Sequence, residues 1–304
     1  MRADIKLNSI AEFHEFSGLS KPDHPLVSLI DYSLVKYPLE YTDIRWVQGF
    51  YSIGLKRNVA KKFNYGQQSY DFNEGILAMV GPQQVIRIEI DPNAAADPSG
   101  WLLLIHPDFL WKTALASRMN KCVFFGYAVN EALFLSHKEE QMIVEVFKTI
   151  QQECQSNIDK FSHNIIISLI ELLLNYSERF YERQFLTRRI SNDKILSRLE
   201  LILDEYFNED YLLKNGTPGV QDLANKLNLT PNYLSSLLKV LTGKSTQDHI
   251  HHKIIEKAKE KLSTTDLSIS EIAYELGFEH SSSFSKLFKQ KTSQTPLAFR
   301  QSFN

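Results

Sequence analysis

Hydrophobic positions in the first 130 residues occur in short runs that turn-forming residues separate. The apolar or aromatic runs lie at 44–53, 75–80, 84–90 and 101–106, and Pro82, the segments 91–93 and 97–100, and Pro107 interrupt them. Many short runs with regular turn residues are typical of a sandwich or a small barrel. The pattern therefore predicts a β domain over residues 1–130.

From about Ser136 the apolar residues recur at a helical period. Ser136 followed by Glu139 and Glu140 is typical of a helix start, and apolar residues continue at helical spacing from Ile143 to Ile150. A second helix is predicted over 159–185, with apolar positions on more than one face. Such a helix packs within its own domain or against a second subunit. We therefore assign 131–186 to a helical dimerisation region and expect a homodimer.

The last third of the chain carries one pattern twice, over residues 222–239 and 271–289. Both copies open with an acidic residue, an aliphatic residue and Ala, and both end with two apolar residues and Lys. The offset is 49 residues from Asp222 to Glu271 but 50 from Leu234 to Phe284. The second copy is therefore one residue longer at its turn. Polar and basic residues at 187–194 are the predicted linker before this region.

Each copy has the residue types that a helix-turn-helix requires. Ala224 and Ala273 are small residues where two helices cross. Asn228 and Gly277 tolerate a left-handed backbone at the turn. The second helix of such a motif lies in the major groove of DNA, so the pattern predicts double-stranded DNA as a partner.

The outward side chains of the two second helices are the candidate DNA contacts. Short hydroxyl side chains can approach bases or phosphates, and Asn can pair with adenine. The alternative is that these residues only solvate a surface helix. The predicted set is Asn232, Tyr233, Ser235, Ser236 and Lys239 in the first copy, and His280, Ser281, Ser282, Ser285, Lys286 and Lys289 in the second.

Residues 246–262 between the copies follow one continuous helical pattern, whose predicted inward residues are Ile250, Ile254, Ile255, Ala258 and Leu262. Seventeen residues give a helix of roughly 25 Å, long enough to hold two recognition helices in neighbouring turns of the major groove, about 34 Å apart. Lys253, Lys257, Lys259 and Lys261 on its outward face are interpreted as a solvated surface. His251 and His252 have no third ligand at a suitable spacing, so no metal is expected.

Composition and charge add a division between the two halves. The chain of 304 residues has an ordinary soluble composition, with 43% hydrophobic and 23% charged residues. From Pro218 onward, 11 Lys and Arg against 8 Asp and Glu give a net charge of +3. Because the whole chain has a net charge of −2, the residues before Pro218 have a net charge of −5. No apolar run is long enough for a membrane span or a secretory signal. With two cysteines at no metal or redox spacing, we expect a cytoplasmic protein.

Residues 195–304 resemble the DNA-binding domain of the AraC/XylS family of bacterial transcription regulators. The matching segments are 269–278, 283–289 and 295–300. The resemblance implies an all-α domain in which a long helix joins two helix-turn-helix motifs. It also implies a sequence-specific regulator, usually an activator, that can contact RNA polymerase. A glycine common after the second recognition helix is Ser293 here, and an arginine common in the linker helix is Ile254.

Residues 70–84 resemble cupin-like sensor domains, which implies a small β-barrel that binds a small-molecule effector. The fold class is therefore α+β, a cupin-like barrel followed by helices and the all-α domain. The metal-binding pattern of cupins is missing, because His14, His24 and His106 are scattered. We expect no metal or cofactor. The expected pocket walls are Trp46, Phe50, Tyr51 and Trp101.

Two other functions compete with a sequence-specific regulator. A cupin-type enzyme would need a catalytic group in residues 1–130, where the sequence shows no metal triad, nucleophile elbow or phosphate loop. An architectural protein would bind DNA without choosing a sequence. We therefore predict a non-enzymatic, sequence-specific regulator.

Overall fold

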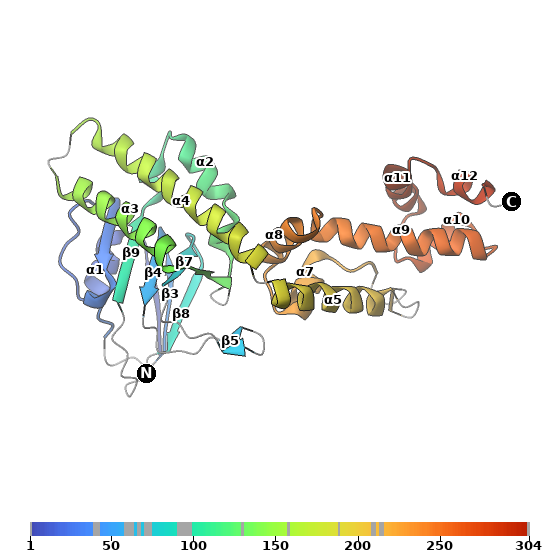
Figure 1. Cartoon of the computed structure of the whole chain (residues 1–304), viewed down its shortest axis with the longest axis horizontal. Helices are drawn as coiled ribbons and strands as arrows, with labels where there is room; N and C mark the ends of the chain where they lie inside the picture. Colours follow the sequence, from blue (N-terminus) through green and yellow to red (C-terminus); the bar gives the residue numbers. More distant parts are fainter. Residues whose placement is uncertain are drawn as a thin grey trace. The chain divides into compact units, whose positions relative to one another are not determined.

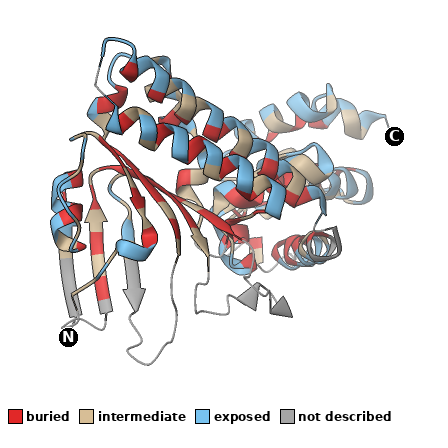
Figure 2. Ribbon diagram, turned by 60° about the vertical axis from the view of Figure 1, so that its left-hand side comes forward, coloured by how far each residue is buried: buried red, intermediate tan, exposed pale blue. Residues whose placement is uncertain are grey.

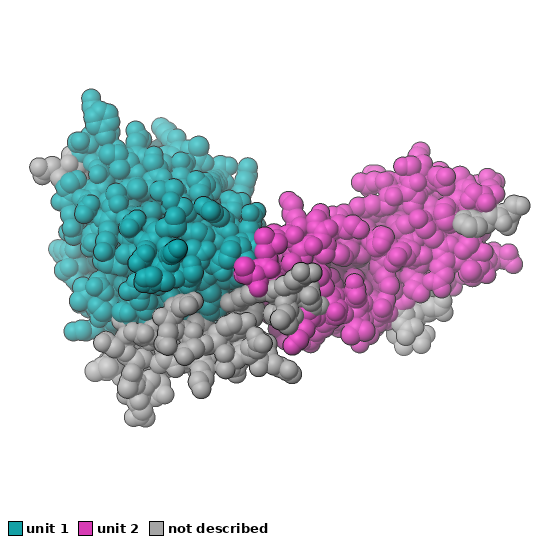
Figure 3. All heavy atoms as spheres, viewed as in Figure 1, with its two compact units in different colours: residues 1–184 teal, residues 185–304 magenta. Residues whose placement is uncertain are grey.

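The structure is a computed structural model. It describes residues 2–38, 43–57, 64–65, 68–69, 75–89, 99–128, 131–156, 159–187, 189–207, 211–212 and 216–302. Two compact units divide the chain, unit 1 at 1–184 and unit 2 at 185–304 (Figure 3). Within the described ranges, none of the helices combines the length and the apolar character that crossing a membrane requires.

Unit 1 contains two main β-sheets. The larger is antiparallel, with strand order β10-β7-β4-β9-β2. In the smaller, β3 pairs in parallel with β1 and antiparallel with β8, and β5 and β6 form a short separate pair. The strands are β1 (Arg2–Leu7), β2 (Val27–Asp31), β3 (Asp43–Gln48), β4 (Tyr51–Arg57), β5 (Asn64–Tyr65), β6 (Gln68–Ser69), β7 (Ile76–Val80), β8 (Val85–Glu89), β9 (Ser99–Ile105) and β10 (Leu133–Phe134).

The predicted apolar run 44–53 is divided between these two sheets. The chain bends at Gly49, where the Gly49 N–H donates to the carbonyl of Leu7 at 2.7 Å. A Cβ at Gly49 would lie 3.0 Å from the Asn8 carbonyl oxygen, so this close approach favours glycine. The described strands lie in separate open sheets, and a closed cupin-like barrel is not confirmed. The predicted turn at 91–93 and the first part of the 70–84 segment lie outside the described residues.

Helices cover one face of the larger sheet (Figures 1 and 2). As predicted, Ser136 begins a helix: its hydroxyl accepts the Glu139 N–H, and the Glu139 carboxylate accepts the Ser136 N–H. The buried residues of this helix recur at helical spacing from Ile143 to Ile150. The helical segments of unit 1 are α1 (Ile10–Phe16), η1 (Tyr32–Leu34), η2 (Pro107–Leu110), α2 (Ala114–Lys121), η3 (Val123–Gly126), α3 (His137–Gln155) and α4 (Ser162–Thr187).

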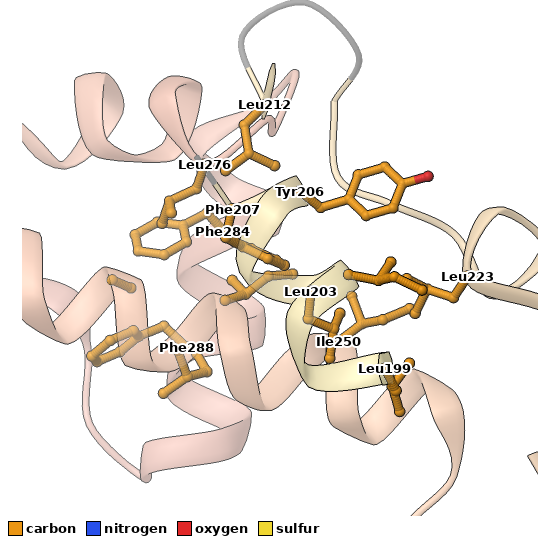
Figure 4. Close-up of a cluster of buried hydrophobic side chains, with 14 of the residues drawn as sticks. Leu199, Leu203, Tyr206, Phe207, Leu212, Leu223, Ile250, Leu276, Phe284 and Phe288 are labelled. Carbon is orange, nitrogen blue, oxygen red and sulfur yellow. The ribbon is translucent and has the colours of Figure 1, made fainter. Parts of the chain in front are cut away.

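Unit 2 is helical in its described part and has one hydrophobic core. Leu203 from α5, Ile250 from α9 and Phe284 from α11 meet in this core (Figure 4). The helices are α5 (Arg189–Tyr206), α7 (Val220–Leu227), α8 (Pro231–Thr242), α9 (Thr246–Thr264), α10 (Ile269–Glu275), α11 (Ser281–Thr292) and α12 (Pro296–Gln301).

The predicted linker at 187–194 is largely helical. Helix α4 ends at Thr187, α5 begins at Arg189, and the boundary between the two units follows Gln184. Asn192 is buried, and its side-chain amide donates to the carbonyl of Phe185. The polar composition of the segment indicated a loop, but its described residues are helical, and the Asn192 side chain bonds to the last turn of α4.

Candidate nucleic-acid interface

Helices α7 and α8 form the first motif, and α10 and α11 form the second. At the turns, Asn228 has φ 56° and Gly277 has φ 82°, so both predicted left-handed positions are confirmed. In each motif, the N–H five residues after the buried Ala of the first helix donates back to the carbonyl of that Ala. Leu229 donates to Ala224, and Phe278 donates to Ala273, both at 2.9 Å.

The two second helices begin differently. The Thr230 hydroxyl accepts the N–H of Tyr233 at 3.3 Å, and Pro231 occupies the first turn of α8. His280 precedes α11 without a side-chain capping hydrogen bond. The extra residue of the second copy is Glu279, because the equivalent backbone hydrogen bonds end at Leu229 and Phe278 and the N-caps are Thr230 and His280.

In α8, most of the predicted outward residues reach the surface. Asn232 and Lys239 are exposed, and Ser235 and Ser236 are half-buried. The Ser235 hydroxyl lies 3.0 Å from the hydroxyl of buried Thr246, so this serine also joins α8 to α9.

The prediction that Tyr233 faces outward is wrong, because the structure buries this side chain. Its side chain is 2% exposed, and its ring packs edge-on against Phe185 at 5.2 Å. Leu237, one turn later, is also buried. Helix α8 therefore has a second buried side in addition to the Leu234 and Leu238 side that enters the core of unit 2. The helical period did not reveal the burial of Tyr233, because the Phe185 ring that packs against it comes from a distant part of the sequence.

Helix α11 presents a more polar surface. His280, Ser282, Lys286 and Lys289 are exposed, while Ser281 and Ser285 are half-buried. The position equivalent to Tyr233 is Ser283, which is exposed. Phe284 and Phe288 are buried as predicted.

Helix α9 joins the motifs. It spans Thr246–Thr264, and the predicted inward residues Ile250, Ile254, Ile255, Ala258 and Leu262 are all buried. Lysines on other sides of the helix form ion pairs: Lys257 with Glu260 at 3.0 Å, Lys261 with Glu275 at 2.8 Å, and Lys253 with Asp204. Lys259 is exposed, as interpreted, whereas Lys253 and Lys261 are only 25% and 13% exposed and link α9 to α5 and α10.

A groove of about 330 Å³ with charges of both signs lies between α9 and the end of α11. It is lined by Lys244, Lys259, Lys291 and His252 and by the carboxylates of Asp248 and Glu256. Lys291 donates to the Asp248 carboxylate at 2.8 Å, and this bond and those from Ser245 hold the Asp248 pKa well below its usual range. The sequence analysis did not select Lys244 and Lys291. Their position just beyond, or in, the last turn of each recognition helix is the signal that could have found them.

The four aromatic residues predicted for an effector pocket do not come together. Trp46 and Phe50 are buried in the hydrophobic core beside the smaller sheet, where Trp46 packs against Phe16 and Tyr37. The Tyr51 hydroxyl donates to the Asn120 side-chain oxygen at 2.8 Å. Trp101 is half-buried on β9.

Comparison with known proteins places the two motifs in a known domain type. Residues 223–302 match the family model described as a helix-turn-helix domain. This chain is 27% identical over 163 residues to the HTH-type transcriptional regulator YfiF of Bacillus subtilis, covering 51% of this chain and 48% of YfiF. It is 36% identical over 102 residues to the raffinose operon transcriptional regulatory protein RafR of Pediococcus pentosaceus, covering 32% of this chain and 37% of RafR.

The chain thus spans about half or less of the length of these curated relatives. Among solved structures, the C-terminal domain of the two-component response regulator yesN from Fusobacterium nucleatum is 33% identical, with a TM-score of 0.30, covering 34% of this chain and 95% of that domain. The C-terminal part of this chain carries an AraC-type helix-turn-helix domain.

Proposed function

We propose that this chain is a sequence-specific DNA-binding transcription regulator. The observation that carries the proposal is the presence of two helix-turn-helix motifs, joined by α9 around one core, that each leave polar side chains on their second helix exposed. Helix α9 has 19 residues and is roughly 28 Å long. That length suits two recognition helices entering successive turns of the major groove.

The exposed and half-buried polar residues of α8 and α11 would make two kinds of contact with DNA. Lys239, Lys286 and Lys289 supply attraction to phosphates, which weakens as salt rises. Asn232, Ser236 and Ser282 supply the short polar groups that can reach base edges. Tyr233 is left out of this set because it is buried.

The test is fluorescence anisotropy with DNA fragments selected by the protein from a genomic library, compared with random duplexes across a salt series. Lys286→Glu and Ser236→Glu are expected to lower specific affinity at least tenfold while thermal unfolding changes little. Lys148→Glu makes the same charge change as Lys286→Glu at an exposed position of α3. It is the matched control and should bind DNA as wild type does. Equal affinities and equal salt slopes for selected and random duplexes would show an architectural protein instead.

Unit 1 is proposed to be the sensor part of the regulator, of the cupin-like kind that the sequence suggests at 70–84. It would bias DNA binding, or a contact with RNA polymerase, when a small-molecule effector binds, and activation is the expected outcome. We assign it no catalytic role. Such a regulator would act on chromosomal DNA in the cytoplasm.

The proposed homodimer uses the outer face of α4. Ile165 and Leu172 on α4 are 41% and 38% exposed, and Phe161, immediately before the helix, is 56% exposed and lies one turn before Ile165. Apolar side chains in a row on one helix face are typical of a surface that a partner covers, and a second copy of the same helix fits because dimers pair identical patches.

Sedimentation velocity tests the dimer. Ile165→Glu combined with Leu172→Glu is expected to convert a dimer to a monomer, while Glu171→Gln on the neighbouring face of α4 leaves the dimer intact. A wild-type protein that sediments as a monomer at tens of micromolar would refute this part of the proposal without affecting the DNA-binding part.

A further inference from the structure

A cavity of about 260 Å³ lies in unit 1, away from the four aromatic residues that the sequence suggested. Its walls come from the loop before β2, from η2, from the end of α3 and from the start of α4. Segments that are distant in the sequence converge there, which is typical of a binding pocket.

The floor of the cavity is apolar. Leu26, Phe109 and Ile166 form it, and Phe109 and Ile166 are almost fully buried. The rings of His24 and His163 lie 5.6 Å and 4.6 Å from the Phe109 ring. A compact apolar or aromatic group could pack among these side chains.

His24 adds a hydrogen-bonding group without adding a positive charge. Burial and the neighbouring His163 lower the pKa of His24, so its ring is neutral at pH 7. The Leu26 N–H donates to His24 Nδ1 at 3.1 Å, and the neutral ring therefore carries its proton on Nε2.

The remaining polar wall is acidic. Asp108, Glu153 and Asp159 line the cavity, and among the residues described there no Lys or Arg side chain does. Asp159 accepts the N–H groups of Phe161 at 2.7 Å and Ser162 at 3.0 Å, which lower the pKa of its carboxyl and keep it ionised.

The buried thiol of Cys154 completes the wall. It is 8% exposed and forms no disulfide. Burial, with the charges of Asp23 and Glu153, raises its pKa to about 11. The thiol therefore stays neutral and adds no further negative charge to the wall.

We propose that this cavity binds a small organic cation, an amine with a compact apolar or aromatic body. The carboxylates accept the ammonium N–H groups, as charge-assisted hydrogen bonds require, and the Phe109 and Ile166 floor covers the body. An organic anion would face three carboxylates and, among the described lining residues, neither Lys nor Arg. A bare metal ion is not favoured, because the described residues contain no group of three His, Cys, Asp or Glu arranged to hold one.

Isothermal titration calorimetry of the full-length protein without DNA tests the proposal. The probes are benzylamine, benzyl alcohol and benzoate, which share a ring and differ in charge. Benzylamine is expected to bind at least tenfold more tightly than the other two. Equal binding of benzylamine and benzoate, or no binding of benzylamine, would overturn the proposal.

The matched variants lie on one helix. Glu153→Gln should weaken benzylamine binding by roughly tenfold, the effect of losing one charge-assisted hydrogen bond. Glu145→Gln, two turns earlier on α3 and outside the cavity, should have no effect. Equal losses in both variants would show that only general surface charge attracts the amine. If circular dichroism shows Glu153→Gln to be unfolded, Asp108→Asn replaces it, because the Asp108 side chain is 76% exposed.

A regulatory role for the cavity rests on the proposed function. Two separate measurements distinguish the binding of the amine from its effect on DNA binding. Benzylamine binding is measured without DNA, and its effect on DNA affinity is measured afterwards by anisotropy. Binding without an effect on DNA would leave the cation site standing and remove only its role as the regulatory site.

Discussion

The two helix-turn-helix motifs share a left-handed residue at the turn, but they differ in how much of the recognition helix is buried. Helix α8 is capped by Thr230 and buries Tyr233 and Leu237 on a second side. Helix α11 lacks a side-chain cap and carries exposed Ser283 at the position of Tyr233. The first motif is therefore anchored on two sides, while the second leaves more polar surface free. We expect α11 to contribute more of the polar contacts to DNA.

The stability of unit 2 can be followed separately from that of unit 1. All three tryptophans, Trp46, Trp101 and Trp111, lie in unit 1. Tryptophan fluorescence therefore reports the unfolding of unit 1, whereas far-ultraviolet circular dichroism reports helices in both units. A variant that affects only the motifs should move the dichroism transition in urea and leave the fluorescence transition in place.

Tyr233→Ala is expected to have the largest effect. Removing a fully buried aromatic ring costs about 3–5 kcal/mol, so the dichroism midpoint should fall strongly. Ser283→Ala at the matching position of α11 should change stability by less than about 0.5 kcal/mol, because Ser283 is exposed. Similar effects at both positions would contradict the idea that only α8 has a second buried side.

Gly277→Ala is expected to cause the second largest loss of stability. At φ 82°, an alanine would be strained, and its Cβ would lie 2.7 Å from the Thr217 nitrogen and 2.9 Å from the Gly216 carbonyl carbon. The left-handed strain and these backbone contacts together should cost about 2–4 kcal/mol.

The matched change in the first motif is Asn228→Gly, which relieves a left-handed residue at φ 56°. Urea unfolding should place it within about 1 kcal/mol of wild type. If Gly277→Ala is equally mild, the loop at Gly216 and Thr217 adjusts easily and the second turn is no more constrained than the first.

Substitutions at the ends of the two recognition helices are expected to change stability in opposite directions. Gly243 after α8 and Ser293 after α11 are both left-handed, with φ 72° and 63°. Gly243→Ala should destabilise by about 1 kcal/mol, from backbone conformation alone, since a Cβ there meets no atom within 4 Å. Ser293→Gly should stabilise by about 0.5–1 kcal/mol. Thermal unfolding followed by dichroism measures both, and shifts of the same sign would contradict the prediction.

The sequence predicted what depends on local pattern. The left-handed turns at Asn228 and Gly277 and the inward face of α9 follow from residue type and period, and the structure confirms them. The burial of Tyr233 depends on Phe185, from another helix. The cavity near Phe109 and the bend at Gly49 likewise depend on contacts between distant segments, which periodicity does not encode. The site residues on α8 and α11 stay predictions until DNA binding is measured.

The smallest expected effect concerns how α11 is held to α9. In the first motif a short covalent loop joins α8 to α9, whereas in the second the Lys291–Asp248 ion pair ties the last turn of α11 to the first turn of α9. The Asp248 pKa is depressed in the folded protein. Its contribution to stability is therefore complete above the ordinary aspartate pKa of about 4 and is lost as the pH falls below it.

Asp248→Asn should accordingly lower the stability of unit 2 slightly at pH 6, with the difference from wild type shrinking as the pH falls from 5 to 3. The effect is small because the pair is solvent-exposed and screened by salt. Asp266→Asn removes an exposed carboxylate elsewhere in the same unit and serves as the control. Urea midpoints by dichroism at each pH provide the measurement. A constant difference between Asp248→Asn and wild type across this range would mean that the ion pair adds nothing that depends on charge, and that packing alone holds α11 on α9.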